Sequence, residues 1–159
     1  KWPPHRLRKL PGKVLLQLDL PEGPAFRHVS ALGLDNPYYG QAPLVVDLDG
    51  DGRQDVLWLN MGGPLRAFLN TSHAHFLLVT LPDRADLAGT RITLVTAAGR
   101  RITRTLLNNT GLMTDQTPEL AFGLGEEVEI ERLIIRAPDG TERELPGPPA
   151  DRRLRLRIP

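Results

Sequence analysis

One short segment of the chain brings four carboxylates together within nine residues. It reads Asp47-Leu-Asp-Gly-Asp-Gly-Arg-Gln-Asp55, which places acids at positions 1, 3, 5 and 9. Carboxylates so close together repel one another unless a cation lies among their oxygens, and Ca²⁺ takes about six to eight oxygen ligands. We therefore expect a calcium loop in which Asp47, Asp49, Asp51 and Asp55 supply carboxylates and Arg53 supplies its backbone carbonyl.

This loop differs from an EF-hand. An EF-hand carries a bidentate Glu at position 12 and lies between two helices. Here position 12 is Trp58, and the flanking segments 44–49 and 55–60 have the apolar character of strands. No His or general base occurs within the loop, so a structural ion is favoured over a catalytic one. The alternative is a solvated acidic turn that holds no ion.

Two further groups of side chains could bind ligands. His73 and His75 are two residues apart and would share one face of a strand, which suits either a transition metal or a structural role. The C-terminal strand carries a row of arginines that could bind phosphate or acidic glycans, or could form a solvated face that blunts a sheet edge. These arginines are Arg152, Arg153, Arg155 and Arg157.

Composition excludes several classes of function. The 159 residues include 20 Lys and Arg against 19 Asp and Glu, so no net field favours nucleic acid. There is no cysteine, hence no disulfide or thiolate chemistry, and no apolar run approaches the ~20 residues of a membrane span. No nucleophile elbow, phosphate loop, zinc-protease helix or dinucleotide fingerprint is present. We expect a protein that is not an enzyme.

The elements that must hold these residues are short strands. Gly and Pro contribute 15 residues each and divide the chain into segments, none of which follows a helical period. Ala137-Pro-Asp-Gly140 has the composition of a tight turn between two strands. The sequence predicts an all-β, sandwich-like fold with strands near residues 13–20, 26–30, 44–49, 55–60, 66–70, 75–82, 90–96, 101–107, 128–135, 141–145 and 153–158.

The first 24 residues form a separate part of the chain. Residues 1–13 are basic and proline-containing and predict an extended arm, and residues 13–20 follow as an apolar strand. Such a strand can add to an exposed sheet edge. Exchange between chains would produce a homopolymer through residues 13–20, whereas pairing within one chain would not, and both alternatives remain open.

Two resemblances cover roughly residues 25–159. Phe26-Arg-His-Val-Ser-Ala-Leu-Gly-Leu34, Tyr39-Gly40 and the acidic loop resemble the calcium blade of FG-GAP/VCBS propeller repeats. From Asn70 the chain is similar to the ASPIC/UnbV domain of cartilage acidic protein-like secreted proteins, although Ala137 stands where that family commonly has Trp. The matching stretches are 70–76, 89–92, 98–100, 122–125 and 138–140.

The resemblances imply three parts and an extracellular location. These parts are an arm at residues 1–24, an FG-GAP/VCBS-like calcium unit at residues 25–70 and an ASPIC/UnbV-like β-sandwich at residues 71–159. We expect a secreted or cell-surface, calcium-stabilised structural protein that is adhesive or assembles into a filament by strand exchange. The alternative is a module that binds a glycan or receptor through a sandwich face or the loops around Trp58 and Tyr38-Tyr39. A related alternative is the C-terminal piece of a larger propeller protein.

Overall fold

The computed structural model describes residues 15–20, 23–28, 33–107, 109–111, 114–115 and 117–157. The predicted basic arm, residues 1–13, lies outside them. Within the described residues there is no α-helix, and one 3-10 turn, η2 (Ala85–Leu87), interrupts the strands. The prediction of an all-β fold is therefore confirmed.

The chain divides into two compact units. One unit comprises residues 1–44 and 56–68, and the other comprises residues 45–55 and 69–159. The acidic loop thus belongs to the same unit as the C-terminal strands. The domain boundaries predicted at residues 24/25 and 70/71 remain predictions.

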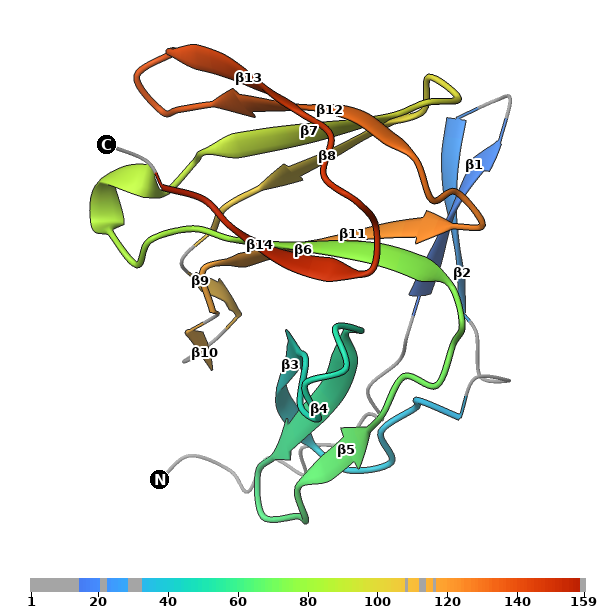
Figure 1. The fold of residues 1–159 in the computed structure, drawn as a ribbon. Helices are drawn as coiled ribbons and strands as arrows, with labels where there is room; N and C mark the ends of the chain where they lie inside the picture. Colours follow the sequence, from blue (N-terminus) through green and yellow to red (C-terminus); the bar gives the residue numbers. More distant parts are fainter. Residues whose placement is uncertain are drawn as a thin grey trace. The chain divides into compact units, whose positions relative to one another are not determined.

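The C-terminal unit is a sandwich of two sheets (Figure 1). In the three-stranded sheet, β6 (His75–Thr80) lies between β11 (Glu119–Gly125), to which it is antiparallel, and β14 (Arg152–Arg155), to which it is parallel. The four-stranded sheet has the order β13 (Glu142–Pro146), β12 (Ile130–Arg136), β7 (Arg91–Thr96), β8 (Arg101–Thr105).

Alternation of apolar residues explains why these strands pack face to face. On β11, Leu120, Phe122 and Leu124 are buried, whereas the intervening residues are more exposed. Successive side chains of a strand point to opposite faces, so one face of β11 joins the core. Residues from both sheets form a single apolar cluster, which includes Ile92 of β7 and Leu133 of β12. The predicted sandwich is confirmed.

The four-stranded sheet contains two antiparallel hairpins, and the second has the predicted turn. β7 pairs with β8, and β12 pairs with β13, each antiparallel. Ala137-Pro-Asp-Gly140 forms the second turn, in which the Gly140 N–H donates to the Ala137 carbonyl at 3.0 Å. Gly140 has φ of 90°, a backbone conformation that glycine adopts without steric cost.

The acidic loop joins two strands, as predicted. β3 (Gly40–Val46) and β4 (Asp55–Asn60) flank it, and β5 (Arg66–Phe68) completes a three-stranded sheet of order β3-β4-β5. Trp58 of β4 is 8% exposed, and its indole N–H donates to the Leu34 carbonyl at 3.1 Å. Trp58 is therefore a packing residue, whereas binding of a glycan or receptor by the loops around Trp58 and Tyr38-Tyr39 remains a prediction.

The N-terminal strand pairs within its own chain. β1 (Leu15–Leu20) and β2 (Gly23–His28) form a two-stranded antiparallel sheet, with Leu15 opposite His28 and Leu20 opposite Gly23.

Two further short strands, β9 (Asn109–Gly111) and β10 (Thr114–Asp115), form another two-stranded sheet.

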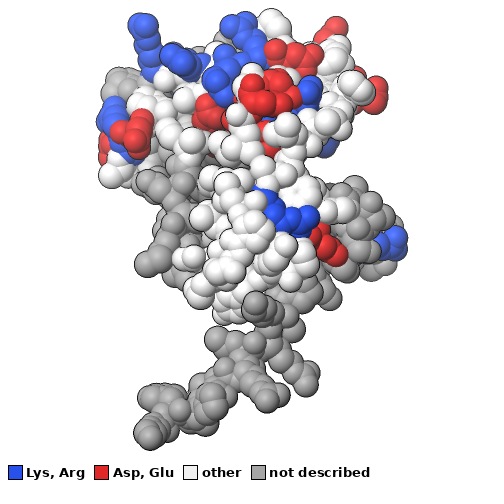
Figure 2. Space-filling model, turned by 90° about the horizontal axis from the view of Figure 1, so that it is seen from below, with Lys and Arg blue, Asp and Glu red and all other residues white. Residues whose placement is uncertain are grey.

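Charged residues of both signs are interspersed on the surface. On the face shown in Figure 2, basic and acidic side chains lie beside one another, next to a broad area of uncharged residues. This intermingling agrees with the formal net charge of +1. None of the helical segments among the described residues is long and apolar enough to cross a membrane.

Candidate metal centre

Backbone geometry folds the acidic loop tightly between its strands. Asp47 directly follows β3, and Asp55 is the first residue of β4. Between them, Gly52 has φ of 91° and lies against the ring of Phe76, so that an added Cβ would collide with the ring. Glycine is required at this position for both reasons. Contact with Phe76 on β6 fixes the loop to the sandwich.

The carboxylate of Asp47 organises the turn. Its Oδ1 accepts the Gly50 N–H at 2.8 Å, and its Oδ2 accepts the Gly52 N–H at 3.0 Å. Asp49 Oδ1 likewise accepts the Asp51 N–H at 3.2 Å. Aspartates commonly stabilise turns by such local bonds, and the loop is therefore ordered by its own side chains.

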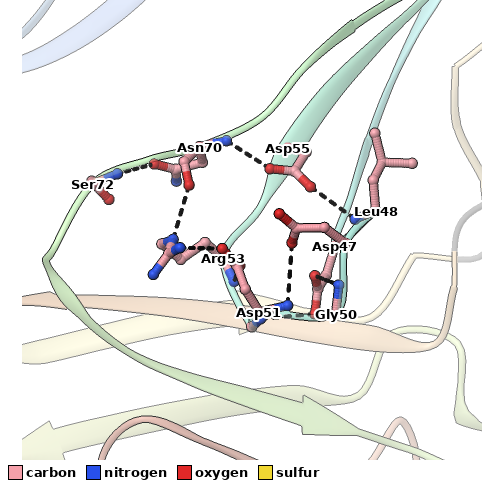
Figure 3. A network of polar contacts seen from close by, with 10 residues as sticks. Asp47, Leu48, Gly50, Asp51, Arg53, Asp55, Asn70 and Ser72 are labelled. Carbon is pink, nitrogen blue, oxygen red and sulfur yellow. Dashed lines mark hydrogen bonds and ion pairs between the residues drawn. The ribbon is translucent and has the colours of Figure 1, made fainter.

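Asp55 connects the loop to the chain segment that leads into β6. Its Oδ2 accepts the Leu48 N–H at 2.8 Å, and its Oδ1 accepts the Asn70 N–H at 2.7 Å (Figure 3). Asp55 is 1% exposed, and among the described residues no cationic side chain forms an ion pair with it. A buried carboxylate without a cationic partner is costly, which makes this position favourable for a metal ion.

Three of the predicted acids come together. Asp47, Asp49 and Asp55 each offer a carboxylate oxygen, and the three oxygens lie within 4.8 Å of one another. Oxygen is the donor that Ca²⁺ and Mg²⁺ prefer, and a carboxylate oxygen that accepts one N–H retains a further lone pair. The donor set therefore fits a hard divalent cation, with the remaining ligands supplied by water or backbone carbonyls.

Asp51 and Arg53 form a different set of contacts. The Arg53 guanidinium makes an ion pair with Asp51 Oδ2 and donates from Nε to the Asn70 carbonyl at 2.8 Å (Figure 3). The Arg53 N–H donates to Asp51 Oδ1 at 2.8 Å. Asp51 is thus held by Arg53, outside the group of three acids. Ligation by the Asp51 carboxylate and by the Arg53 carbonyl remains a prediction.

One cation reaches the acidic loop from the far end of the sequence. Arg153 of β14 donates from Nη2 to Asp47 Oδ2 at 3.0 Å, while its Nε lies 3.1 Å from Glu119 Oε1. The Asp47 side chain is 1% exposed, so this pair supplies charge compensation to a buried carboxylate. Sequence reasoning placed Arg153 in a row of surface arginines and missed this contact, because 106 residues separate the partners.

The two histidines occupy different environments. His75 Nδ1 lies 2.6 Å from Asp151 Oδ2, and this hydrogen bond, followed by the Phe76 N–H, holds the pKa of Asp151 below its usual value. His73 is exposed, and no described contact links it to His75. His75 therefore couples β6 to the residue preceding β14. A transition-metal role for the pair gains no support from these contacts.

Comparison with known proteins identifies the C-terminal part of the chain. Residues 82–159 match the family described as ASPIC and UnbV, a domain typical of secreted proteins. No curated protein matches the sequence. The acidic loop precedes the matched residues, whereas Glu119 and Arg153 lie within them, and the FG-GAP/VCBS resemblance of the loop remains a prediction. The segment that spans residues 82–159 is an ASPIC/UnbV domain.

Proposed function

We propose that this chain is a calcium-stabilised structural part of an extracellular protein and has no catalytic role. The observation that carries the proposal is the convergence of Asp47, Asp49 and Asp55 within 4.8 Å, with Asp55 buried. The extracellular location is supported by the ASPIC/UnbV domain. Calcium is abundant outside cells, where even sites of 10⁻⁴–10⁻³ M affinity can fill.

The loop would act by tying separate segments of the C-terminal unit together. Asp47 follows β3 and Asp55 begins β4, while the Asn70 N–H connects Asp55 to the segment before β6. A bound Ca²⁺ would supply the positive charge that keeps these carboxylates together. At a hundredfold excess over Kd, binding to the native state alone stabilises a fold by about 2.7 kcal/mol.

Asp49→Asn is the sharpest test of this role. The amide oxygen of Asn can still accept the Asp51 N–H, so the turn is preserved while one negative ligand is removed. We expect the variant to lose most of the calcium-dependent rise in melting temperature and to match the wild type in excess chelator. Asp83→Asn, a change at an exposed acid outside the loop, serves as the control.

Two results would contradict the proposal. One is a wild-type melting temperature that calcium does not change. The other is an equal loss of stability for Asp49→Asn with calcium and with chelator, which would make Asp49 a turn residue only.

Self-assembly is a second candidate role, supported by the N-terminal hairpin. β1 has β2 as its partner in a two-stranded sheet, and such a hairpin is marginally stable in isolation. In strand exchange, β1 would leave β2 and pair with a sheet edge of another copy. Repetition of that contact would build a filament. In an adhesive protein, the same sheet edge would bind a strand of another protein.

Light scattering of the purified chain tests this second role. We expect the full chain to form large particles in millimolar calcium and the variant without residues 1–20 to form none. Repeating the measurement in excess chelator shows whether assembly requires calcium. A deletion variant that assembles as the full chain does would exclude exchange of β1. A monomer of 17.6 kDa under every condition would exclude self-assembly.

A further inference from the structure

A cavity of about 510 Å³ lies in the C-terminal unit, away from the acidic loop. Residues of the β12–β13 hairpin line one part of it, and residues at the end of β14 line another. This volume is within the ~300–1,000 Å³ that small-molecule sites commonly occupy. None of the acids of the candidate metal centre lines it, so the cavity is a separate candidate site.

Three arginines contribute to the lining of the cavity without a counter-ion. Arg143 comes from β13, Arg155 is the last residue of β14, and Arg157 follows it; all three are exposed. In the part of the chain that the structure describes, no carboxylate forms an ion pair with any of them. Arginine is the side chain best suited to bind carboxylate or sulfate in a bidentate manner.

The remaining lining is apolar, with a polar group at the hairpin turn. Ile135 and Leu156, which are 8% and 9% exposed, lie against the core, and Leu145 and Ala137 complete the apolar part. Asp139 lies at the turn, where its Oδ1 accepts the Thr141 N–H at 2.8 Å.

This hydrogen bond to Thr141 lowers the pKa of Asp139, which is therefore ionised at neutral pH. An ionised carboxylate accepts several hydrogen bonds. The lining thus combines cationic groups, an apolar surface and a strong acceptor for hydroxyl groups.

A sugar acid combines the complementary groups. Its carboxylate or sulfate would meet the arginines, its C–H face would meet Ile135 and Leu156, and its hydroxyl groups would donate to Asp139. A long alkyl chain suits the cavity less well, because an ionised Asp139 lies beside the apolar lining. An inorganic anion would leave the apolar lining without a contact.

We propose that this cavity binds an acidic saccharide of one or two sugar units, held by Arg143, Arg155 and Arg157. The site would let an extracellular protein contact acidic polysaccharide at a terminal residue. It does not depend on calcium in the acidic loop.

Isothermal titration of the full chain with a uronic-acid disaccharide tests the proposal. Maltose, a neutral disaccharide, and decanoate, an anion with an alkyl chain, are the comparison probes. We expect saturable binding of the acidic disaccharide and a loss of at least about tenfold in affinity for Arg143→Gln and for Arg155→Gln. Arg101→Gln, which removes an exposed arginine outside the cavity, should bind as the wild type does.

A second variant tests the apolar lining without a change in charge. Ala137→Leu introduces a larger side chain at the lining and should weaken binding while the fold, followed by circular dichroism, is retained. Several outcomes would overturn the proposal: no binding of the acidic disaccharide at millimolar concentration, binding of decanoate in its place, or equal losses in Arg101→Gln and Arg143→Gln. Unchanged affinity in Ala137→Leu would equally exclude this cavity as the site.

Discussion

Replacing Asp55 with alanine should destabilise the fold even when no calcium is present. Asp55 is 1% exposed, and its two oxygens accept the backbone N–H groups of Leu48 at 2.8 Å and Asn70 at 2.7 Å. Alanine leaves both N–H groups without this partner. The predicted loss of stability therefore comes from the protein's own hydrogen bonds and can be measured without bound metal.

The magnitude follows from those two hydrogen bonds. A buried N–H without a partner costs about 1–3 kcal/mol. Leu48 is 42% exposed, so water can partly replace the lost acceptor, and the lower part of that range applies. Together the two groups give about 2–4 kcal/mol. For a chain of this size, that corresponds to a fall of roughly 5–15 °C in melting temperature.

The assay is thermal unfolding in excess chelator, followed by circular dichroism. Asp55→Ala should unfold at a lower temperature than the wild type, whereas Asp83→Ala, at an exposed position, should not differ from it. Asp49→Asn provides a second comparison, because it is expected to match the wild type under these conditions. An Asp55→Ala variant with wild-type stability in chelator would refute the structural role assigned to Asp55.

Three further predictions concern the core, the acid range of pH and the arginine at the acidic loop. Phe122 is 0% exposed at the centre of the sandwich, so Phe122→Ala should cost about 3–5 kcal/mol in urea unfolding, and a loss below 1 kcal/mol would contradict its place in the core. The hydrogen bond with His75 lowers the pKa of Asp151 in the folded state. The ionised Asp151 therefore stabilises the fold fully above the ordinary Asp pKa of about 3.9, and this stabilisation is lost as pH falls through the lowered pKa of the folded state. The stability difference between wild type and Asp151→Asn should therefore shrink as pH is reduced from about 5 to 2, and a constant difference would exclude this coupling. Arg153→Gln removes a cation 3.0 Å from Asp47 Oδ2, so titration calorimetry should show tighter calcium binding. Stability in chelator should fall, because the buried Asp47 carboxylate loses its charge compensation. Weaker calcium binding would show that Arg153 does not compete with the ion.

Features set by neighbouring residues could be predicted from the sequence. The composition of Ala137-Pro-Asp-Gly140 specifies the turn of the β12–β13 hairpin. The acidic loop was recognisable for the same reason, since its carboxylates lie within nine residues. Strand β11 was missing from the predicted strands, although Leu120, Phe122 and Leu124 alternate toward the core. The pairing of β1 was left open by its sequence, and the structure pairs it with β2.

Contacts between distant residues were decided by tertiary structure alone. Arg153 reaches Asp47 because β14 lies beside β6 in parallel, and nothing in the local Arg-Leu-Arg alternation distinguishes Arg153 from Arg155. The indole N–H of the buried Trp58 likewise donates to the Leu34 carbonyl, 24 residues away.

The arginines of the C-terminal strand also have different roles that their sequence alone does not reveal. Arg153 neutralises a buried carboxylate, whereas Arg155 and Arg157 line a cavity with Arg143 of another strand. Periodicity determines which side chains share a face of one strand, but the groups that meet that face come from other segments of the chain. Their identity depends on how the strands pack, which no local pattern encodes.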